Sequence, residues 1–310
     1  MSKLVLLVPV LTSLALAGCA SDLDAMDDDA ELTSVSIETS GLEPLAGGFL
    51  YEGWAIIDGA PVSFGKFNVD LSGTITDPDG IAIPGSQLSA GRDLSTATDI
   101  VITVEPAVDN DIVPSESKML GGALASGQAT LTTAHAGTGF ASDFADATGR
   151  FILATPTSAS EEDETSGVWF LDLSSNPPIP GLMLPELGEG WAYEGWVVFE
   201  GQDGPVPVST GTFLAADMPD DFDVFSGPLG GPAVPGEDLV ANAPEGWSFP
   251  TDLSGRTVVI SVEPVPDDSP APFVLKPLAG DVPDSAADHQ TLPMTNIAGG
   301  FPTMEVTLVP

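Results

Sequence analysis

The stretch Tyr51-Glu52-Gly53-Trp54 occurs twice in this chain, because residues 193–196 repeat it letter for letter. Three further stretches recur in the same order after each copy. They are residues 61–67 with 207–213, 101–106 with 259–264, and 118–122 with 276–280. We therefore interpret the chain as one unit that is present twice, with insertions confined to turns.

The composition favours short strands over helices. The 310 residues include 34 glycines and 29 prolines, and a proline inside a helix removes a hydrogen bond and clashes with the preceding turn. Short apolar runs bounded by turn residues predict strands at 35–39, 49–57, 63–69, 100–105, 150–155, 168–173, 191–199, 209–215, 257–263 and 304–309. Only residues 141–147 suggest a helix. The pattern predicts an all-β protein with two tandem antiparallel β-sandwich domains related by internal duplication.

The repeat also sets the predicted boundaries. Repeat 1 should cover residues 32–157 and repeat 2 residues 166–310, with an acidic linker at 158–165 that contains Glu161-Glu162-Asp163-Glu164. Repeat 2 is the longer copy, and its extra length lies near residues 217–250. Each copy is long enough for its own core.

The beginning of the chain has the pattern of an export signal. Lys3 precedes an apolar run over residues 4–16 that is too short and too interrupted to span a bilayer. The run ends in Leu16-Ala17-Gly18-Cys19, which resembles the bacterial lipoprotein signal, whose cysteine is lipidated. We therefore expect a signal peptide at 1–18, lipidation at Cys19 and an acidic tether at 19–31. No aspartate follows Cys19 directly, which favours the outer membrane or cell surface over the inner membrane.

The charge balance excludes some partners. The chain has 46 acidic and 7 basic residues, a net charge of −39 at pH 7, so nucleic acid would be repelled. Adaptation to high salt is the favoured explanation, because the acids are scattered over the whole chain. Calcium binding is the alternative, through Asp109-Asn110-Asp111 or the aspartates at 217, 220, 221 and 223. Neither group has a known calcium-loop spacing, so we predict no metal site and no cofactor.

One pair of repeated glutamates, Glu52 and Glu194, supplies candidate site residues. Alternation along a strand places Glu52 and Trp54 on one face and Tyr51 on the other, where Gly53 should leave room for an aromatic ring. Glu52 and its copy Glu194 act either as ligands or acids, or as acceptors of backbone N–H groups at a turn or bulge. The second interpretation is favoured because both belong to a duplicated scaffold motif. Similarly, Glu105 and Glu263 each precede a proline and should anchor the following loop.

Catalytic motifs are missing from the sequence. Ser115-Glu116-Ser117-Lys118 is similar to the Ser-x-x-Lys of penicillin-recognising enzymes, but Phe273 replaces the serine in the second copy and the partner motifs are absent. His135 and His289 have no histidine or cysteine companions, which makes a transition-metal site unfavourable. We therefore predict no catalytic residues. Trp247, with Phe249 and Pro250, is a further candidate binding residue, for which partial burial in the core is the simpler explanation.

The order of these motifs resembles the C-terminal, extracytoplasmic domain of anti-sigma-K factors. The matching residues are Trp54, Gly65, Phe67, Val104, Glu105 and Pro106, and in the second copy Trp196, Gly211, Phe213, Val262, Glu263 and Pro264. The resemblance implies a small β-sandwich with a sensing or protein-binding role. Sigma-factor binding does not carry over, because the family's cytoplasmic helical domain and membrane-spanning helix have no counterpart here.

Together these features predict a lipid-anchored, non-enzymatic protein of the cell envelope. It would attach to the membrane through Cys19 and bind or sense another envelope protein, with Glu52, Glu194 and Trp247 as possible contact residues. Two alternatives stay open: a carbohydrate or peptide hydrolase that uses paired carboxylates, and a calcium-dependent surface adhesin.

The charge gives a first testable prediction. Because salt shortens the range of self-repulsion to roughly 3 Å at 1 M, the mature protein should unfold at a higher temperature in about 2 M than in about 50 mM salt. Thermal unfolding followed by circular dichroism measures the difference. Equal melting temperatures would reject the salt explanation for the acidic surface.

Overall fold

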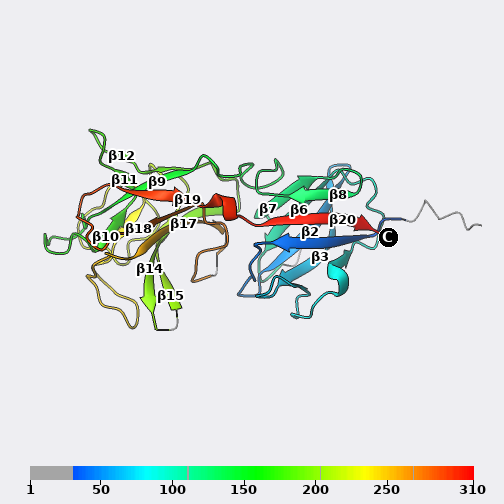
Figure 1. Cartoon of the computed structure of the whole chain (residues 1–310), viewed down its shortest axis with the longest axis horizontal. Helices are drawn as coiled ribbons and strands as arrows, with labels where there is room; N and C mark the ends of the chain where they lie inside the picture. Colours follow the sequence, from blue (N-terminus) through cyan, green and yellow to red (C-terminus); the bar gives the residue numbers. More distant parts are fainter. Residues whose placement is uncertain (1–30, 110–111, 203, 268) are drawn as a thin grey trace, which may run out of the picture. The chain divides into compact units, whose positions relative to one another are not determined.

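The computed structural model describes residues 31–310 apart from 110–111, 203 and 268, so the predicted signal peptide, Cys19 and nearly all of the tether lie outside the described residues. The described chain is nearly all β, with only two 3-10 turns, and every strand pairing it contains is antiparallel (Figure 1). The predicted fold class is confirmed. Within the described residues, no helix has the length and apolar character needed to cross a bilayer.

The first half of the chain holds nine strands and one 3-10 turn. They are β1 (Ser34–Ser40), β2 (Leu50–Ile57), β3 (Ala60–Val69), β4 (Ile75–Thr76), η1 (Pro84–Ser86), β5 (Gln87–Ser89), β6 (Asp99–Glu105), β7 (Lys118–Ala123), β8 (Gln128–Leu131) and β9 (Thr148–Leu153). The second half holds β10 (Gly167–Trp169), β11 (Leu171–Asp172), β12 (Ile179–Pro180), β13 (Leu182–Met183), β14 (Trp191–Gly201), β15 (Gly204–Phe213), β16 (Gly236–Asp238), β17 (Thr257–Pro264), β18 (Leu278–Asp281), β19 (Leu292–Asn296), η2 (Ala298–Gly300) and β20 (Thr303–Val309).

Each predicted strand range contains an observed strand, whereas the prediction of a helix at 141–147 was wrong. Phe140 and Phe144 both enter the core from an irregular segment, and Phe144 has a φ of 59° that no right-handed helix allows. The Asn296 side chain donates hydrogen bonds of 2.8 and 2.9 Å to the carbonyl oxygens of Phe144 and Ala147. The carbonyl oxygens that would accept hydrogen bonds within a helix therefore accept them from the Asn296 side chain, which is distant in the sequence.

Strand pairing does not follow the predicted boundary between the repeats. The last strand of the chain, β20, lies between β1 and β8 of the first half. The last strand of repeat 1, β9, lies between β10 and β19 of the second half. Each repeat thus supplies its final strand to the sheet of the other repeat, an arrangement we call the strand exchange.

The exchange is symmetric. One sheet has the order β5-β1-β20-β8, and a bridge between Gly121 and Thr132 joins this end to the sheet β7-β6-β2-β3-β4. The other sheet has the matching order β16-β10-β9-β19-β18-β17-β14-β15. Even the register agrees, because Tyr51 pairs with Val104 as Tyr193 pairs with Val262. Two copies of one topology are therefore present, and neither copy is closed by its own residues alone.

The predicted acidic linker is held by hydrogen bonds among its own residues and to the end of repeat 1. The Glu164 side chain accepts from the Thr155 amide at 3.1 Å, and the Asp163 side chain accepts from the Ser158 hydroxyl at 3.0 Å. Just before the linker, the Thr157 amide donates to the buried Asp238 carboxylate at 2.7 Å. Residues 158–165 therefore form a turn with defined polar contacts.

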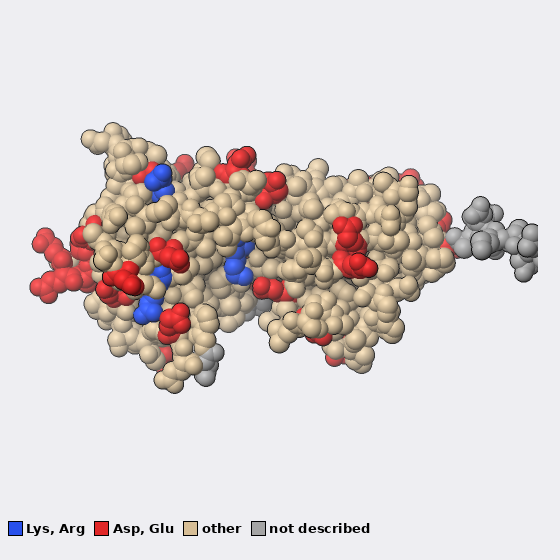
Figure 2. All heavy atoms as spheres, in the orientation of Figure 1, with Lys and Arg blue, Asp and Glu red and all other residues tan. Residues whose placement is uncertain are grey.

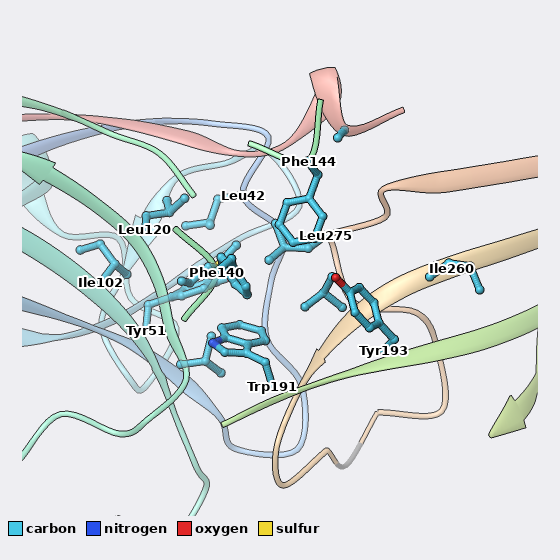
Figure 3. Close-up of a cluster of buried hydrophobic side chains, with 14 of the residues drawn as sticks. Leu42, Tyr51, Ile102, Leu120, Phe140, Phe144, Trp191, Tyr193, Ile260 and Leu275 are labelled. Carbon is cyan, nitrogen blue, oxygen red and sulfur yellow. The ribbon is translucent and has the colours of Figure 1, made fainter. Parts of the chain in front are cut away.

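The two copies share a continuous apolar core. Tyr51 stacks on Phe67 and Tyr193 stacks on Phe213, each pair with ring centroids 5.6 Å apart. Between them lies Trp191, whose ring centroid is 4.7 Å from that of Phe140 (Figure 3). Aromatic side chains of this size supply much of the burial in a core, so contacts across the repeat boundary add to those within each copy.

Gly53 gives a prediction for the packing of the repeated strand. A Cβ at this position would lie 1.9 Å from the Phe64 ring on the adjacent strand, so the expected room for an aromatic ring is present. Gly53→Ala should lower the free energy of unfolding by at least about 1–3 kcal/mol, because a packed core resists added volume. Denaturant titration should show this loss. The control is Gly299→Ala, which meets no atom within 4 Å and should change stability little; equal effects would contradict the packing argument.

Candidate functional site

Glu52 and Glu194 each hold a β-bulge. The pairing of β2 with β3 shifts register between Gly53 and Trp54, and Gly65 opposite the shift has a φ of 123°. The Ser63 hydroxyl donates to Glu52 Oε1 at 2.5 Å and accepts from the Gly65 amide at 3.1 Å. The carboxylate therefore fixes the bulge through a serine rather than by accepting the amide directly, which was the expected contact.

The second copy repeats this arrangement. The shift between Gly195 and Trp196 lies opposite Gly211, which has a φ of 106°. The Ser209 hydroxyl donates to Glu194 Oε1 and accepts from the Gly211 amide at 3.0 Å. The same chain of contacts at both sites indicates a scaffold role that was present before the copies diverged.

Glu105 and Glu263 anchor the loops that follow their strands, as the sequence predicts. Glu105 Oε1 accepts from the Thr103 hydroxyl and from the Ser115 amide at 3.1 Å. Glu263 Oε1 accepts from the Ser261 hydroxyl and from the Phe273 amide at 2.8 Å. Both glutamates are 1 % exposed, so these contacts are made in a dry environment.

The repeated tryptophans complete these networks. Trp54 Nε1 donates to the Thr103 hydroxyl at 2.9 Å, and Trp196 Nε1 donates to the Ser261 hydroxyl at 2.8 Å. Each indole thereby orients the hydroxyl that serves the buried glutamate. The tryptophan, hydroxyl and glutamate form a connected polar chain inside each copy.

An aspartate from the following loop joins each glutamate pair. Carboxylate oxygens of Glu52, Glu105 and Asp109 lie within 4.8 Å of one another, and so do those of Glu194, Glu263 and Asp267. We call these sets carboxylate cluster 1 and carboxylate cluster 2. Three acids this close repel one another unless protons or a cation compensate.

Among the described residues, a basic side chain reaches cluster 1 and none reaches cluster 2. Lys66 Nζ lies 2.5 Å from Asp109 Oδ2 and 3.7 Å from Glu52 Oε2. The equivalent residue in the second copy is Thr212, because Lys66 pairs with Glu52 as Thr212 pairs with Glu194. The Thr212 hydroxyl donates instead to Asp221 at 2.9 Å. The copies thus share their acids but differ in charge compensation.

The pKa values reflect this difference. Burial raises the pKa of Glu52, while the Ser63 hydrogen bond and the Lys66 ammonium oppose the rise. Burial raises the pKa of Glu194 to about 7 and that of Glu263 to about 8, and neighbouring carboxylates add to both shifts. Cluster 2 therefore holds its protons at a pH where ordinary glutamates are ionised.

A separate polar pocket lies in the insertion of repeat 2. It has a volume of about 450 Å³ and is bordered by Trp169, Asp220, Phe222 and Glu237, among others. Burial raises the pKa of Asp220 to about 6 and of Glu237 to about 7. Both carboxylates accept backbone amides, from Gly236 at 2.7 Å for Asp220 and from Phe225 at 2.7 Å for Glu237. These hydrogen bonds therefore stabilise the conformation of this segment. Among the described residues, neither Asp220 nor Glu237 belongs to a group of three potential metal ligands.

The remaining residues that the sequence singled out contact neighbouring side chains. Trp247 is partly buried, with its ring centroid 4.7 Å from that of Phe199, which agrees with partial packing in the core. Lys118 Nζ pairs with Glu116 Oε2 at 2.7 Å. His135 Nε2 lies 3.2 Å from Asp99, and His289 Nδ1 lies 3.6 Å from Asp288.

Sequence reasoning missed the third acid of each cluster and the role of Lys66. Asp109 was considered only as part of an acidic loop with residues 110 and 111, which lie outside the described residues. A signal was available, because Glu-Pro-x-x-Asp occurs at 105–109 and again at 263–267. This repeat could not be interpreted from the sequence, because only the tertiary structure shows that the loop aspartate lies beside the glutamate of a neighbouring strand.

Comparisons with known proteins add no assignment: no family model, curated protein or solved structure matches this chain. The resemblance to the outer domain of anti-sigma-K factors therefore stays a prediction.

The different compensation of the clusters predicts unequal effects of one substitution. Glu52→Gln removes a charge that faces Lys66 and should lower the free energy of unfolding by about 1 kcal/mol. Glu194→Gln removes a buried charge with no cation beside it and should leave stability unchanged or raise it. Denaturant titrations in chelator at about pH 8 compare the two variants. A larger loss for Glu194→Gln would contradict this account.

Proposed function

We propose that the protein is a lipid-anchored, non-enzymatic module of the cell envelope that binds or senses another envelope protein. The observation that carries the non-enzymatic part is the symmetry of the candidate acids. Glu52 with Glu105, and Glu194 with Glu263, make the same contacts to a serine hydroxyl and to a loop amide in both copies. An enzyme is expected to gather its polar groups asymmetrically in one cleft.

The negative charge of the protein makes a lipid anchor necessary in this proposal. A net charge of −39 repels an anionic membrane surface, so electrostatic attraction cannot hold the protein there. Acidic side chains are spread across the face drawn in Figure 2, with few basic ones among them. Several acyl chains on Cys19 would provide stable attachment, and the acidic residues 22–31 would act as a spacer.

The second repeat offers an apolar surface for a protein partner. A groove of about 350 Å³ is lined by Leu182, Met183, Leu214 and Ala216, among others. Met183 is 59 % exposed and Leu214 is 72 % exposed. Contiguous exposed apolar surface marks interaction sites on soluble proteins, and salt does not weaken apolar contacts as it weakens ionic ones. This supports a binding role through repeat 2.

The hydrolase alternative has less support. Glu52 and Glu194 belong to different clusters, so they cannot act as one acid pair. Within each cluster the glutamates are almost fully buried and already bound to the scaffold. The adhesin alternative gains support from carboxylate cluster 2 alone.

A crosslinking experiment in intact cells tests the binding role. A photo-reactive residue at Leu214 should crosslink to a distinct envelope protein, because its side chain lies on the apolar groove. The control is the same residue at Leu71, which is 97 % exposed but lies in a turn of repeat 1. Identical products from both positions, or none from Leu214, would count against the groove.

The same cells test the anchor and the absence of catalysis. An alkyne fatty acid should label the wild-type protein but not Cys19→Ser, and the variant should leave the membrane fraction. The purified protein should not turn over peptide or glycan substrates. Turnover that Glu194→Gln abolishes would favour the hydrolase instead.

A further inference from the structure

Two carboxylate oxygens in cluster 2 are buried and have no partner. Glu194 Oε2 and Glu263 Oε2 are both shielded from solvent and accept no hydrogen bond from any described group. Their residues are only 6 % and 1 % exposed. Burying a polar atom without a partner costs free energy, so a native structure that retains two such atoms in one carboxylate cluster requires an explanation.

The first copy shows what fills the equivalent place. Lys66 Nζ lies 3.7 Å from Glu52 Oε2, the atom that corresponds to Glu194 Oε2, and 2.5 Å from Asp109. In the second copy Thr212 turns away, since its amide and hydroxyl both donate to Asp221 at 2.8 and 2.9 Å. No basic side chain contributes to the pKa of Glu194 or Glu263. The second copy therefore has the three acids of the first copy but no side chain equivalent to the Lys66 ammonium.

We propose that Glu194, Glu263 and Asp267 bind a divalent cation of the calcium class, in the place that the Lys66 ammonium takes in the first copy. The inference does not depend on lipid anchoring or on the partner. It depends on three observations. Glu194 and Glu263 each have a buried oxygen without a partner, and one carboxylate oxygen from each of the three acids lies within 4.8 Å of the others. The second copy also has Thr212 where the first copy has the Lys66 ammonium.

The donor set selects the metal. All three ligands are carboxylates, with no histidine or cysteine in the group, which suits a hard cation and not zinc or copper. Magnesium keeps several waters in a rigid octahedron, whereas the two inner ligands are almost dry. Calcium accepts flexible and bidentate carboxylates, and the exposed Asp267 leaves room for water on the outer side.

Binding would also hold the loop after β17. Asp267 lies in this loop, and Glu263 already accepts the amide of Phe273 at the loop's other end. A cation between the two acids would connect both ends of the loop to the sheet.

Calorimetric titration of Ca²⁺ into EDTA-stripped protein is the experiment, carried out in molar salt to suppress binding to the acidic surface. The wild type should show one saturable site that binds Ca²⁺ more tightly than Mg²⁺. Thr212→Lys installs the ammonium of the first copy and should abolish this site. Thr295→Lys, at an exposed position of β19, makes the same charge change and should leave it intact.

The reciprocal change provides a gain of function. Lys66→Thr removes the ammonium from cluster 1 and should add a second Ca²⁺ site, so the stoichiometry should rise from one to two. Asp267→Asn, at an exposed position, should weaken the original site at least about tenfold.

Three results would overturn the proposal. They are weak, non-saturating binding that is equal in all variants, a site that survives Thr212→Lys, and Mg²⁺ binding as tight as Ca²⁺ binding. Melting curves in chelator confirm that each variant is folded. The calcium site and the apolar groove are tested independently. A calcium site, combined with identical crosslinking products from Leu214 and Leu71, would support this inference and reject the groove as a binding surface.

Discussion

The buried glutamate of each Tyr-Glu-Gly-Trp strand is the constraint on which much of the structure depends. A carboxylate in a dry sheet must find donors, and here it finds a serine hydroxyl that also binds the glycine amide of a β-bulge. The bulge requires a glycine with positive φ, and Gly65 and Gly211 provide it. One side chain therefore explains why the motif, the serine and the distant glycine recur together.

The strand exchange changes how the duplication should be understood. Two copies that each folded independently would be separable, but β9 and β20 each complete the sheet of the other copy. Each exchanged strand has partners on both sides, so its removal would leave two unpaired edges. The exchange ties the two ends of the described chain into one cooperative structure, which two tandem domains on a linker would not require.

Duplication also lets the copies diverge around a fixed scaffold. The bulge and the anchored loop are the same in both, whereas Lys66 has become Thr212 or the reverse. The segment between β15 and β17, which carries Asp220 and Glu237, is longer than its counterpart between β3 and β6. These differences leave the shared scaffold intact and change only the charges and the loop around it.

The sequence by itself determined the all-β class, the duplication and the positions of the longer strands, because alternation, proline and glycine act locally. It also predicted that Glu105 and Glu263 anchor loops, since a proline ends each strand there. The exchange of β9 and β20 was decided only by the tertiary structure, because two equivalent strands carry the same local pattern and can pair with either copy. The repeated Glu-Pro-x-x-Asp pattern could not reveal the carboxylate clusters by itself, because Asp109 and Asp267 reach the glutamates only through the folding of their loops. The unpaired oxygens of Glu194 and Glu263 likewise follow from packing in three dimensions.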